Sequence, residues 1–179
     1  MADIKITLLS NEKFEYSETG EEVPTYEAYY YKMNMDQKVM VKKLSPDAIL
    51  PKYAKPGDAG FDLHACETVT IHPHQTTIVP TGLAFAIPEG FEMQVRMRSG
   101  AALKTPLILH NAPGTIDSGY RGEIGLILHN LSDNPYTVEK GERLCQGIIA
   151  PVVSAWFEEV DTLPESERGA NGYGSTGTK

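Results

Sequence analysis

Short runs of apolar or alternating residues, separated by Pro and Gly, follow one another along the chain from Lys43 onward. The segment FEMQV puts Phe91, Met93 and Val95 on one side, which is the two-residue period of a half-buried strand. Many short strands at close spacing, with turn signals between them, are typical of a β-sandwich or barrel. The pattern predicts strands at 61–65, 68–71, 76–80, 83–87, 91–97, 124–130 and 143–153.

Helical patterns are scarce, and the only helix we expect is a short one in SGAALK, residues 99–104. Ahead of the main domain, IKITLL (4–9) and YEAYYYKMN (26–34) are both strand-like and predict a β-hairpin extension. We therefore divide the chain into an extension (1–36), a β core (37–163) and a tail (164–179). The tail is rich in glycine, cannot bury a core, and is expected to be mobile in the free protein.

Composition narrows the class of protein. The 179 residues suit one domain, and 41% hydrophobic residues suffice for a core. No apolar run approaches the roughly 20 residues that span a bilayer, and the N-terminus lacks a secretory pattern. Two cysteines, Cys66 and Cys145, are then expected as reduced thiols of a cytoplasmic protein.

The net charge is −8, and residues 1–36 hold eight acidic against three basic residues. This balance argues against stable binding to a nucleic-acid backbone, which needs a basic patch. A small phosphorylated ligand needs only a few local cations and stays possible. The first 36 residues also hold five of the nine tyrosines, a residue type common at protein interfaces.

The segment APGTIDSGYRGEIG (112–125) sets Asp117 and Tyr120 beside a strand, among four glycines that let a ligand approach the backbone. An ordinary hairpin with an aspartate at its turn is the alternative. In the segment RMRSGAAL (96–103), Arg98, Ser99 and Gly100 could donate hydrogen bonds to phosphate groups. The alternative is a surface arginine that precedes the start of a helix.

Three further segments are ambiguous when each is taken alone. The tail RGANGYGSTG offers Arg168, an aromatic ring that could stack on a base, and hydroxyls, or is a plain disordered terminus. PGDAGFDLHA (56–65) and KGERLCQGII (140–149) could each be a turn and a strand. His72 and His74 have no third ligand at a recognisable spacing, so we expect no zinc site there.

The order of these segments is more specific than any one of them. PGDAGFDL, RSGAA, PGTIDSGYRGEIG, GERLCQ and RGANGYGSTG together resemble the five motifs of the trimeric dUTPase family, over residues 42–179. The resemblance implies a jelly-roll-like homotrimer with three active sites at subunit interfaces. It implies Mg²⁺-dependent hydrolysis of dUTP to dUMP and pyrophosphate, which limits uracil in DNA and supplies dUMP for dTMP synthesis.

The resemblance also implies residue roles. Asp117 is the general base, and Tyr120 packs under the deoxyribose. The phosphates are held by Arg98, Ser99 and Gly100, with Asp62 and Gln146 contacting the metal through water. The substrate-binding residues at and around the uracil are Asn111, Gly114, Thr115, Ile116 and Gly125. The tail of a third subunit closes the site with Arg168, Tyr173, Gly174, Ser175 and Thr176.

The sequence departs from the family pattern at four places, with Tyr173 for a common phenylalanine, Asn171 for glycine, Met97 for proline and Gly119 for an acid. None of these removes a group that hydrolysis needs. A dCTP deaminase of the same superfamily would need an acid–base residue near C4 of the base, and Glu123 is too far along the strand. A partner-binding role of residues 1–36 stays open beside catalysis.

Overall fold

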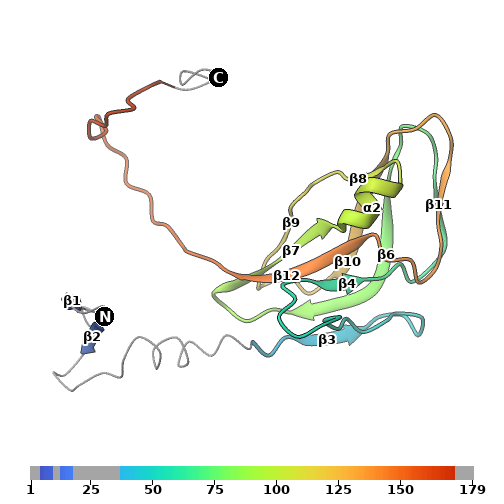
Figure 1. Ribbon diagram of the computed structural model, residues 1–179, viewed down its shortest axis with the longest axis horizontal. Helices are drawn as coiled ribbons and strands as arrows, with labels where there is room; N and C mark the ends of the chain where they lie inside the picture. Colours follow the sequence, from blue (N-terminus) through green and yellow to red (C-terminus); the bar gives the residue numbers. More distant parts are fainter. Residues whose placement is uncertain (1–4, 10–12, 18–36, 172–179) are drawn as a thin grey trace.

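The computed structural model describes residues 5–9, 13–17 and 37–171, whose regular secondary structure is β-strand apart from one short helix (Figure 1). Their only helix is α2, Ser99–Lys104, where a short helix was predicted. The strands are β1 Lys5–Leu9, β2 Lys13–Ser17, β3 Met40–Lys43, β4 Phe61–Leu63, β5 Val69–Ile71, β6 Thr76–Ala86, β7 Phe91–Met97, β8 Leu107–Leu109, β9 Gly114–Ile116, β10 Glu123–Asn130, β11 Tyr136–Val138 and β12 Cys145–Pro151.

Two four-stranded sheets, in the orders β3-β6-β10-β8 and β4-β12-β7-β9, make a sandwich of antiparallel pairs. Side chains alternate along each strand, so every second residue of β10 is buried. The buried residues of both sheets form one hydrophobic cluster, within which Phe61 stacks on Phe85 across the sandwich with ring centroids 6.2 Å apart. The predicted all-β, jelly-roll-like class is confirmed.

One strand replaces two of the predicted ones. Residues 76–80 and 83–87 were expected to be separate, but β6 runs through Pro80 and Gly82 without a break. Proline and glycine are tolerated inside a strand where the pairing is irregular. The register of β6 against β10 shifts at this place, between the partners of Glu123 and Gly125.

Within the β core, four strands (β3, β8, β9 and β11) were not predicted, because each has only three or four residues and shows no readable period. Of the other predicted strands, β7 has the predicted bounds, β10 begins one residue earlier, and β4, β5 and β12 are shorter than predicted. In β7, Met93 and Val95 are buried and Phe91 packs against the core, as the alternation required.

The N-terminal hairpin differs from the expected one. β1 matches the predicted first strand, but its partner is β2, with Lys5 opposite Ser17 and Leu9 opposite Lys13. The predicted second strand, residues 26–34, lies outside the described residues. The hairpin itself is therefore confirmed, with a different second strand.

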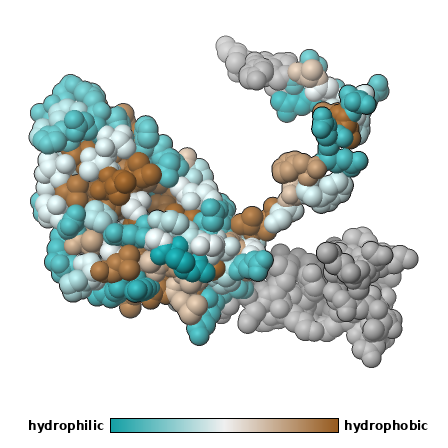
Figure 2. Space-filling model, turned by 180° about the vertical axis from the view of Figure 1, so that it is seen from behind, coloured by the Kyte–Doolittle hydropathy of each residue, from teal (hydrophilic) through white to brown (hydrophobic). Residues whose placement is uncertain are grey.

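After β12 the chain leaves the sandwich. The Val152 N–H donates to the Gly90 carbonyl (2.9 Å), and residues 153–171 then run away from the body with every residue exposed (Figure 1). This segment carries large apolar side chains in contact with solvent, visible as brown atoms along the arm in Figure 2. The most exposed are Val153 at 93%, Trp156 at 82% and Phe157 at 95%. In the described part of the chain, α2 is too short to cross a membrane.

Candidate active site

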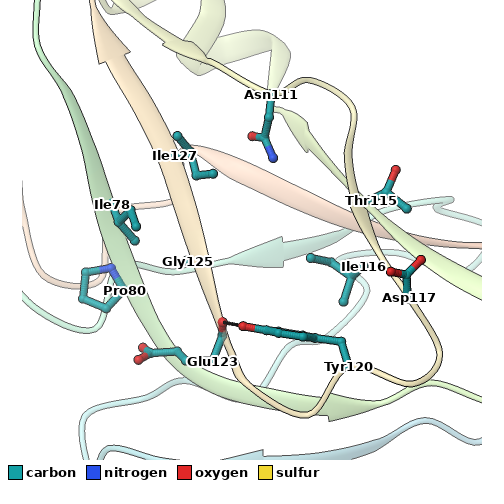
Figure 3. Close-up of a pocket in the computed structure, with 10 residues that line it drawn as sticks. All are labelled: Ile78, Pro80, Asn111, Thr115, Ile116, Asp117, Tyr120, Glu123, Gly125 and Ile127. Atoms are coloured by element: carbon teal, nitrogen blue, oxygen red, sulfur yellow. Dashed lines mark hydrogen bonds between the residues drawn. The ribbon is translucent and has the colours of Figure 1, made fainter.

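A first cavity of about 330 Å³ opens beside β6, β9 and β10 (Figure 3). It collects six of the predicted site residues, which the sequence separates by as many as 14 positions. These six are Asn111, Thr115, Ile116, Asp117, Tyr120 and Gly125, and the remaining lining comes from Ile78, Pro80, Glu123 and Ile127.

Asp117 stands at the end of β9, where the chain turns back toward β10. β9 is an edge strand that pairs with β7 alone, and the Tyr120 N–H donates to the Asp117 carbonyl (3.0 Å) to close the turn. The Asp117 residue is exposed, and its carboxylate accepts no hydrogen bond from any described residue. Its lone pairs are therefore free to accept a proton from a water molecule.

Tyr120 lies across the same cavity. Its ring is fixed by a hydrogen bond from the hydroxyl to the Glu123 carbonyl (3.1 Å), drawn as a dashed line in Figure 3. A Cβ at Gly122 would come within 2.3 Å of the Tyr120 hydroxyl oxygen, so glycine leaves room for the ring. The flat face of a fixed aromatic ring is a good surface for packing a sugar.

Glycines also bring backbone close to the cavity on its other walls. A Cβ at Gly125 would lie 2.5 Å from the Ile78 side chain, and one at Gly114 would lie 3.1 Å from the Asn111 amide nitrogen. Side chains at these positions would displace the cavity wall, and their absence leaves backbone donors and acceptors accessible.

A second cavity, of about 500 Å³, lies between β4, β12 and the start of α2. Asp62 accepts from Arg98 Nε (2.8 Å) at one carboxylate oxygen and from Arg143 (2.9 Å) at the other. Arg98 also donates to the Arg143 carbonyl (3.1 Å). One carboxylate thus holds two guanidinium groups at one wall, an arrangement suited to a polyanion.

Ser99 and Gln146 line this second cavity as well, whereas Gly100 follows in the first turn of α2 without lining it. The Gln146 amide nitrogen contacts the Met97 carbonyl (3.4 Å), which leaves its oxygen as an acceptor. A Cβ at Gly60 would lie 2.4 Å from that oxygen, so glycine keeps the space around it open.

His64, two residues after Asp62, adds no cation to this wall near neutral pH. Burial lowers the pKa of the His64 imidazole, as do Arg143 and Arg98, although the Asp62 carboxylate opposes them. Its Nδ1 atom is buried without a hydrogen-bond partner.

The predicted site is divided on a single chain. The two cavities share no lining residue, so Asp117 and Tyr120 belong to one and the predicted phosphate donors Arg98 and Ser99 to the other. Arg168 lines neither cavity and donates to the Asn171 carbonyl (3.0 Å) within its own segment. The remaining predicted tail residues lie outside the described residues: Tyr173, Gly174, Ser175 and Thr176.

Among the polar residues that line the two cavities, no role was predicted for Arg143, Asp58 and Glu123. Arg143 stands in the segment GERLCQ, and its positive charge was a readable signal, while Asp58 stands in PGDAGFDL. Glu123, which is too far along its strand to be an obvious acid–base residue of a deaminase, lines the first cavity, and its carboxylate accepts from the Gly82 N–H (2.7 Å). The register of β6 against β10 shifts next to Glu123, and no sequence pattern signals such a shift.

Comparison with known proteins identifies the family. The model of the dUTPase family matches residues 46–177. The deoxyuridine 5'-triphosphate nucleotidohydrolase of Picosynechococcus is 52% identical over 136 residues, which cover 76% of this chain and 96% of that protein. The corresponding Helicobacter pylori (strain P12) protein is 46% identical over 140 residues, covering 78% and 97%.

A solved structure agrees with both the sequence relatives and the fold. The dUTPase of Staphylococcus bacteriophage 80alpha, determined with the dUTP analogue dUPNHPP, superposes with a TM-score of 0.74 at 32% identity. The match covers 79% of this chain and 99% of the phage protein. With residues of four of the five motifs gathered at two cavities of a matching β-sandwich, the chain belongs to the dUTPase family and hydrolyses dUTP.

Proposed function

We propose that this dUTPase cleaves dUTP to dUMP and pyrophosphate by attack of a water molecule on the α-phosphorus, with Asp117 as the general base. The main observation in support of this proposal is that the Asp117 carboxylate accepts no hydrogen bond from a described residue and lies in the wall of a cavity that Tyr120 also lines. The new bond joins the water oxygen to the α-phosphorus, and the bond to the bridging oxygen breaks opposite it. The proton passes to Asp117, and the pyrophosphate leaves.

The first cavity binds the nucleoside. Backbone groups of Gly114 to Ile116 and of Gly125, with Asn111, present fixed donors and acceptors to the uracil edge. Cytosine presents the opposite pattern at two positions, and leaving polar groups unpaired there is costly. Tyr120 packs under the deoxyribose and leaves no space for a 2′-hydroxyl. We therefore expect dUTP to be preferred over dCTP, dTTP and UTP.

The second cavity binds the triphosphate. Arg98 and Ser99 line it and donate to phosphate oxygens, and the exposed Gly100 adds a backbone N–H. Arg143 joins this set, because Asp62 holds it next to Arg98. Two guanidinium groups on one carboxylate are pre-positioned, so little side-chain freedom is lost when the phosphates bind.

The oxygen ligands of the second cavity fit a magnesium ion that is held mainly by the phosphates of the substrate. The described residues include no group of three or more His, Cys, Asp or Glu side chains that could enclose a metal. Magnesium keeps several waters and takes oxygen ligands, so phosphates can supply most of them. Asp62 and Gln146, with oxygen acceptors in this cavity, would hold its water shell. When bound, the ion neutralises phosphate charge and polarises the phosphoryl oxygens.

A homotrimer with shared sites explains why the two cavities are separate on one chain. In a closed ring, the first cavity of one subunit can meet the second cavity of its neighbour. The tail of the third subunit, with Arg168, Tyr173, Gly174, Ser175 and Thr176, then closes over the nucleotide. The extended and fully exposed course of residues 153–171 supports such a reach.

Hydrolysis of dUTP in ¹⁸O-labelled water tests the reaction. Mass spectrometry should find the label in dUMP and not in pyrophosphate, because the water oxygen joins the α-phosphorus. Label in pyrophosphate would place the attack on the β-phosphorus and contradict the proposal. Chelation by EDTA should suppress turnover, and added Mg²⁺ should restore it.

A further inference from the structure

The pairing of β6 with β10 is irregular beside the first cavity. Glu123 pairs with Ala84, and two residues later Gly125 already pairs with Pro80. Residues 81–83 of β6 therefore stand opposite Ile124 alone, which makes β6 the bulged strand. A bulge interrupts the regular ladder and leaves backbone groups that need other partners.

Two side chains supply these partners. The N–H of Gly82, a buried residue with φ +67°, donates to Glu123 Oε1 (2.7 Å). The Thr81 hydroxyl donates to the Ile124 carbonyl (2.7 Å). A buried N–H without an acceptor is costly, so the Glu123 carboxylate holds the bulge in this form.

Glu123 is connected at its other end to the ring of Tyr120. Its backbone carbonyl accepts the Tyr120 hydroxyl, and in Figure 3 its carboxylate points toward Pro80, away from Asp117. The same residue thus joins the bulge of β6 to the ring that lines the cavity. This geometry favours an indirect action of Glu123 over direct contact between its carboxylate and the reacting phosphate.

We infer that Glu123 is a positioning residue that sets the preference for deoxyribose over ribose through Tyr120, an inference that depends on the proposed sugar-packing role of Tyr120. The carboxylate fixes the bulge, the bulge fixes the Glu123 carbonyl, and the carbonyl fixes the ring. A ring free to shift would admit a 2′-hydroxyl. The ligand class discriminated is therefore deoxyribonucleotide against ribonucleotide, at an unchanged uracil.

The test compares kcat/KM for dUTP with kcat/KM for UTP. Glu123→Ala removes one hydrogen bond, which should lower the ratio of kcat/KM for dUTP to kcat/KM for UTP by about two- to tenfold. Most of this change should come from a higher kcat/KM for UTP. Glu123→Gln keeps an oxygen acceptor for Gly82 and should keep the ratio. Glu123→Asp keeps the charge but not the reach, and should resemble the alanine variant. Glu89→Ala, an exposed glutamate in the β6–β7 turn, is the matched control.

A cycle with Tyr120→Phe shows whether Glu123 acts through the hydroxyl. The double variant Glu123→Ala/Tyr120→Phe should have the same ratio as Tyr120→Phe alone. The inference would be overturned if the effects of Glu123→Ala and Tyr120→Phe on the ratio were additive in the double variant. It would also be overturned if the ratio were unchanged in both Glu123→Ala and Glu123→Asp. An unchanged ratio in Tyr120→Ala would instead show that the sugar-packing role of Tyr120 is wrong. If Glu123→Ala fails to fold, Glu123→Asp takes its place in the cycle with Tyr120→Phe and tests the same inference.

Discussion

Asp117 is a carboxylate with no hydrogen-bond partner among the described residues, although it stands in the wall of a cavity. The variant Asp117→Asn keeps the shape but cannot take a proton from water. We expect kcat to fall by about 10²- to 10⁴-fold while nucleotide binding largely survives. Steady-state kinetics and calorimetric titration with a non-hydrolysable analogue measure the two effects.

The matched control for this variant is Asp133→Asn, because Asp133 is an exposed aspartate that pairs with His74 (2.9 Å) in a distant loop. It should have wild-type turnover. If Asp117→Asn kept more than about a tenth of the wild-type kcat, Asp117 would not be the base.

Gly82 is a second residue at which one added methyl group should have a large effect. Its φ of +67° favours glycine, and a Cβ there would lie 2.8 Å from Ala48 Cβ. Gly90 has a similar φ of +83° but nothing within 4 Å of the added atom. Gly90→Ala should therefore cost only the backbone term, about 1–2 kcal/mol.

We expect Gly82→Ala to cost a further 1–3 kcal/mol or so through overpacking against Ala48 and Ser45. Thermal unfolding at one fixed protein concentration compares the two variants with the wild type. Equal melting temperatures for the two variants would mean that the wall around Gly82 yields without cost.

The residue types of the site could be predicted from the sequence, whereas their partners could not. Asp117, Tyr120 and Arg98 stood out because they lie among glycines in short motifs. The contacts of Glu123 and Arg143 were not predicted, because they depend on a bulge and on the shared carboxylate of Asp62. Such contacts join residues 41 and 81 positions apart in sequence, which no local pattern encodes.

Among the elements, long strands with a clear period were predictable and very short ones were not. β10 alternates over eight residues and was found, while β9 has three residues and was read as part of a turn. The sequence predicts a strand that ends at Pro80, and proline cannot donate to a ladder. The bulge of β6 removes that requirement locally, and the strand continues.

The hairpin of β1 and β2 lies outside the stretch that the family model matches, which begins at residue 46. We expect a chain without residues 1–36 to keep a near-normal kcat and its trimer mass, since no site motif lies there. Turnover of dUTP and native mass spectrometry measure both. A large loss of kcat in an intact trimer would mean that the extension contributes to the active site. In that case the division of the chain at residue 36 would be wrong.

The tail is an element whose removal should spare the fold. Residues 153–171 are exposed throughout, and the sandwich is complete at β12. A chain that ends at Pro164 should therefore remain trimeric but lose most of its activity, since it lacks Arg168 and Tyr173. Arg168→Ala should reproduce part of the loss, and Glu167→Ala, its neighbour, should not. Full activity of the shortened chain would contradict the closing role of the tail.

At the scale of the whole molecule, the two cavities of the site are separate on a single chain. The two cavities of the site share no residue, yet the water activation and phosphate binding that we propose for them must act on one nucleotide. Assembly resolves this conflict if the first cavity of one subunit meets the second cavity of the next. The family resemblance implied sites shared between subunits, whereas spacing along the chain alone carries no information about which copy contributes a residue.

Mixed trimers test this arrangement directly. Asp117→Asn and Arg98→Ala should each be nearly inactive alone, because one lacks the base and the other a phosphate donor. When the two are unfolded, mixed in equal amounts and refolded together, about a quarter of the sites should combine an intact Asp117 from one subunit with an intact Arg98 from another. Turnover should then rise toward that fraction of the wild type.

Mixing Arg98→Ala with Gln146→Ala is the control for this recovery, since both changes lie in the second cavity and every site keeps a defect. No gain over the separate variants is expected there. If Asp117→Asn and Arg98→Ala formed mixed trimers by mass spectrometry but gained no activity, the base and the phosphate donors would have to come from the same subunit. The two cavities would then have to be joined by a rearrangement within one chain.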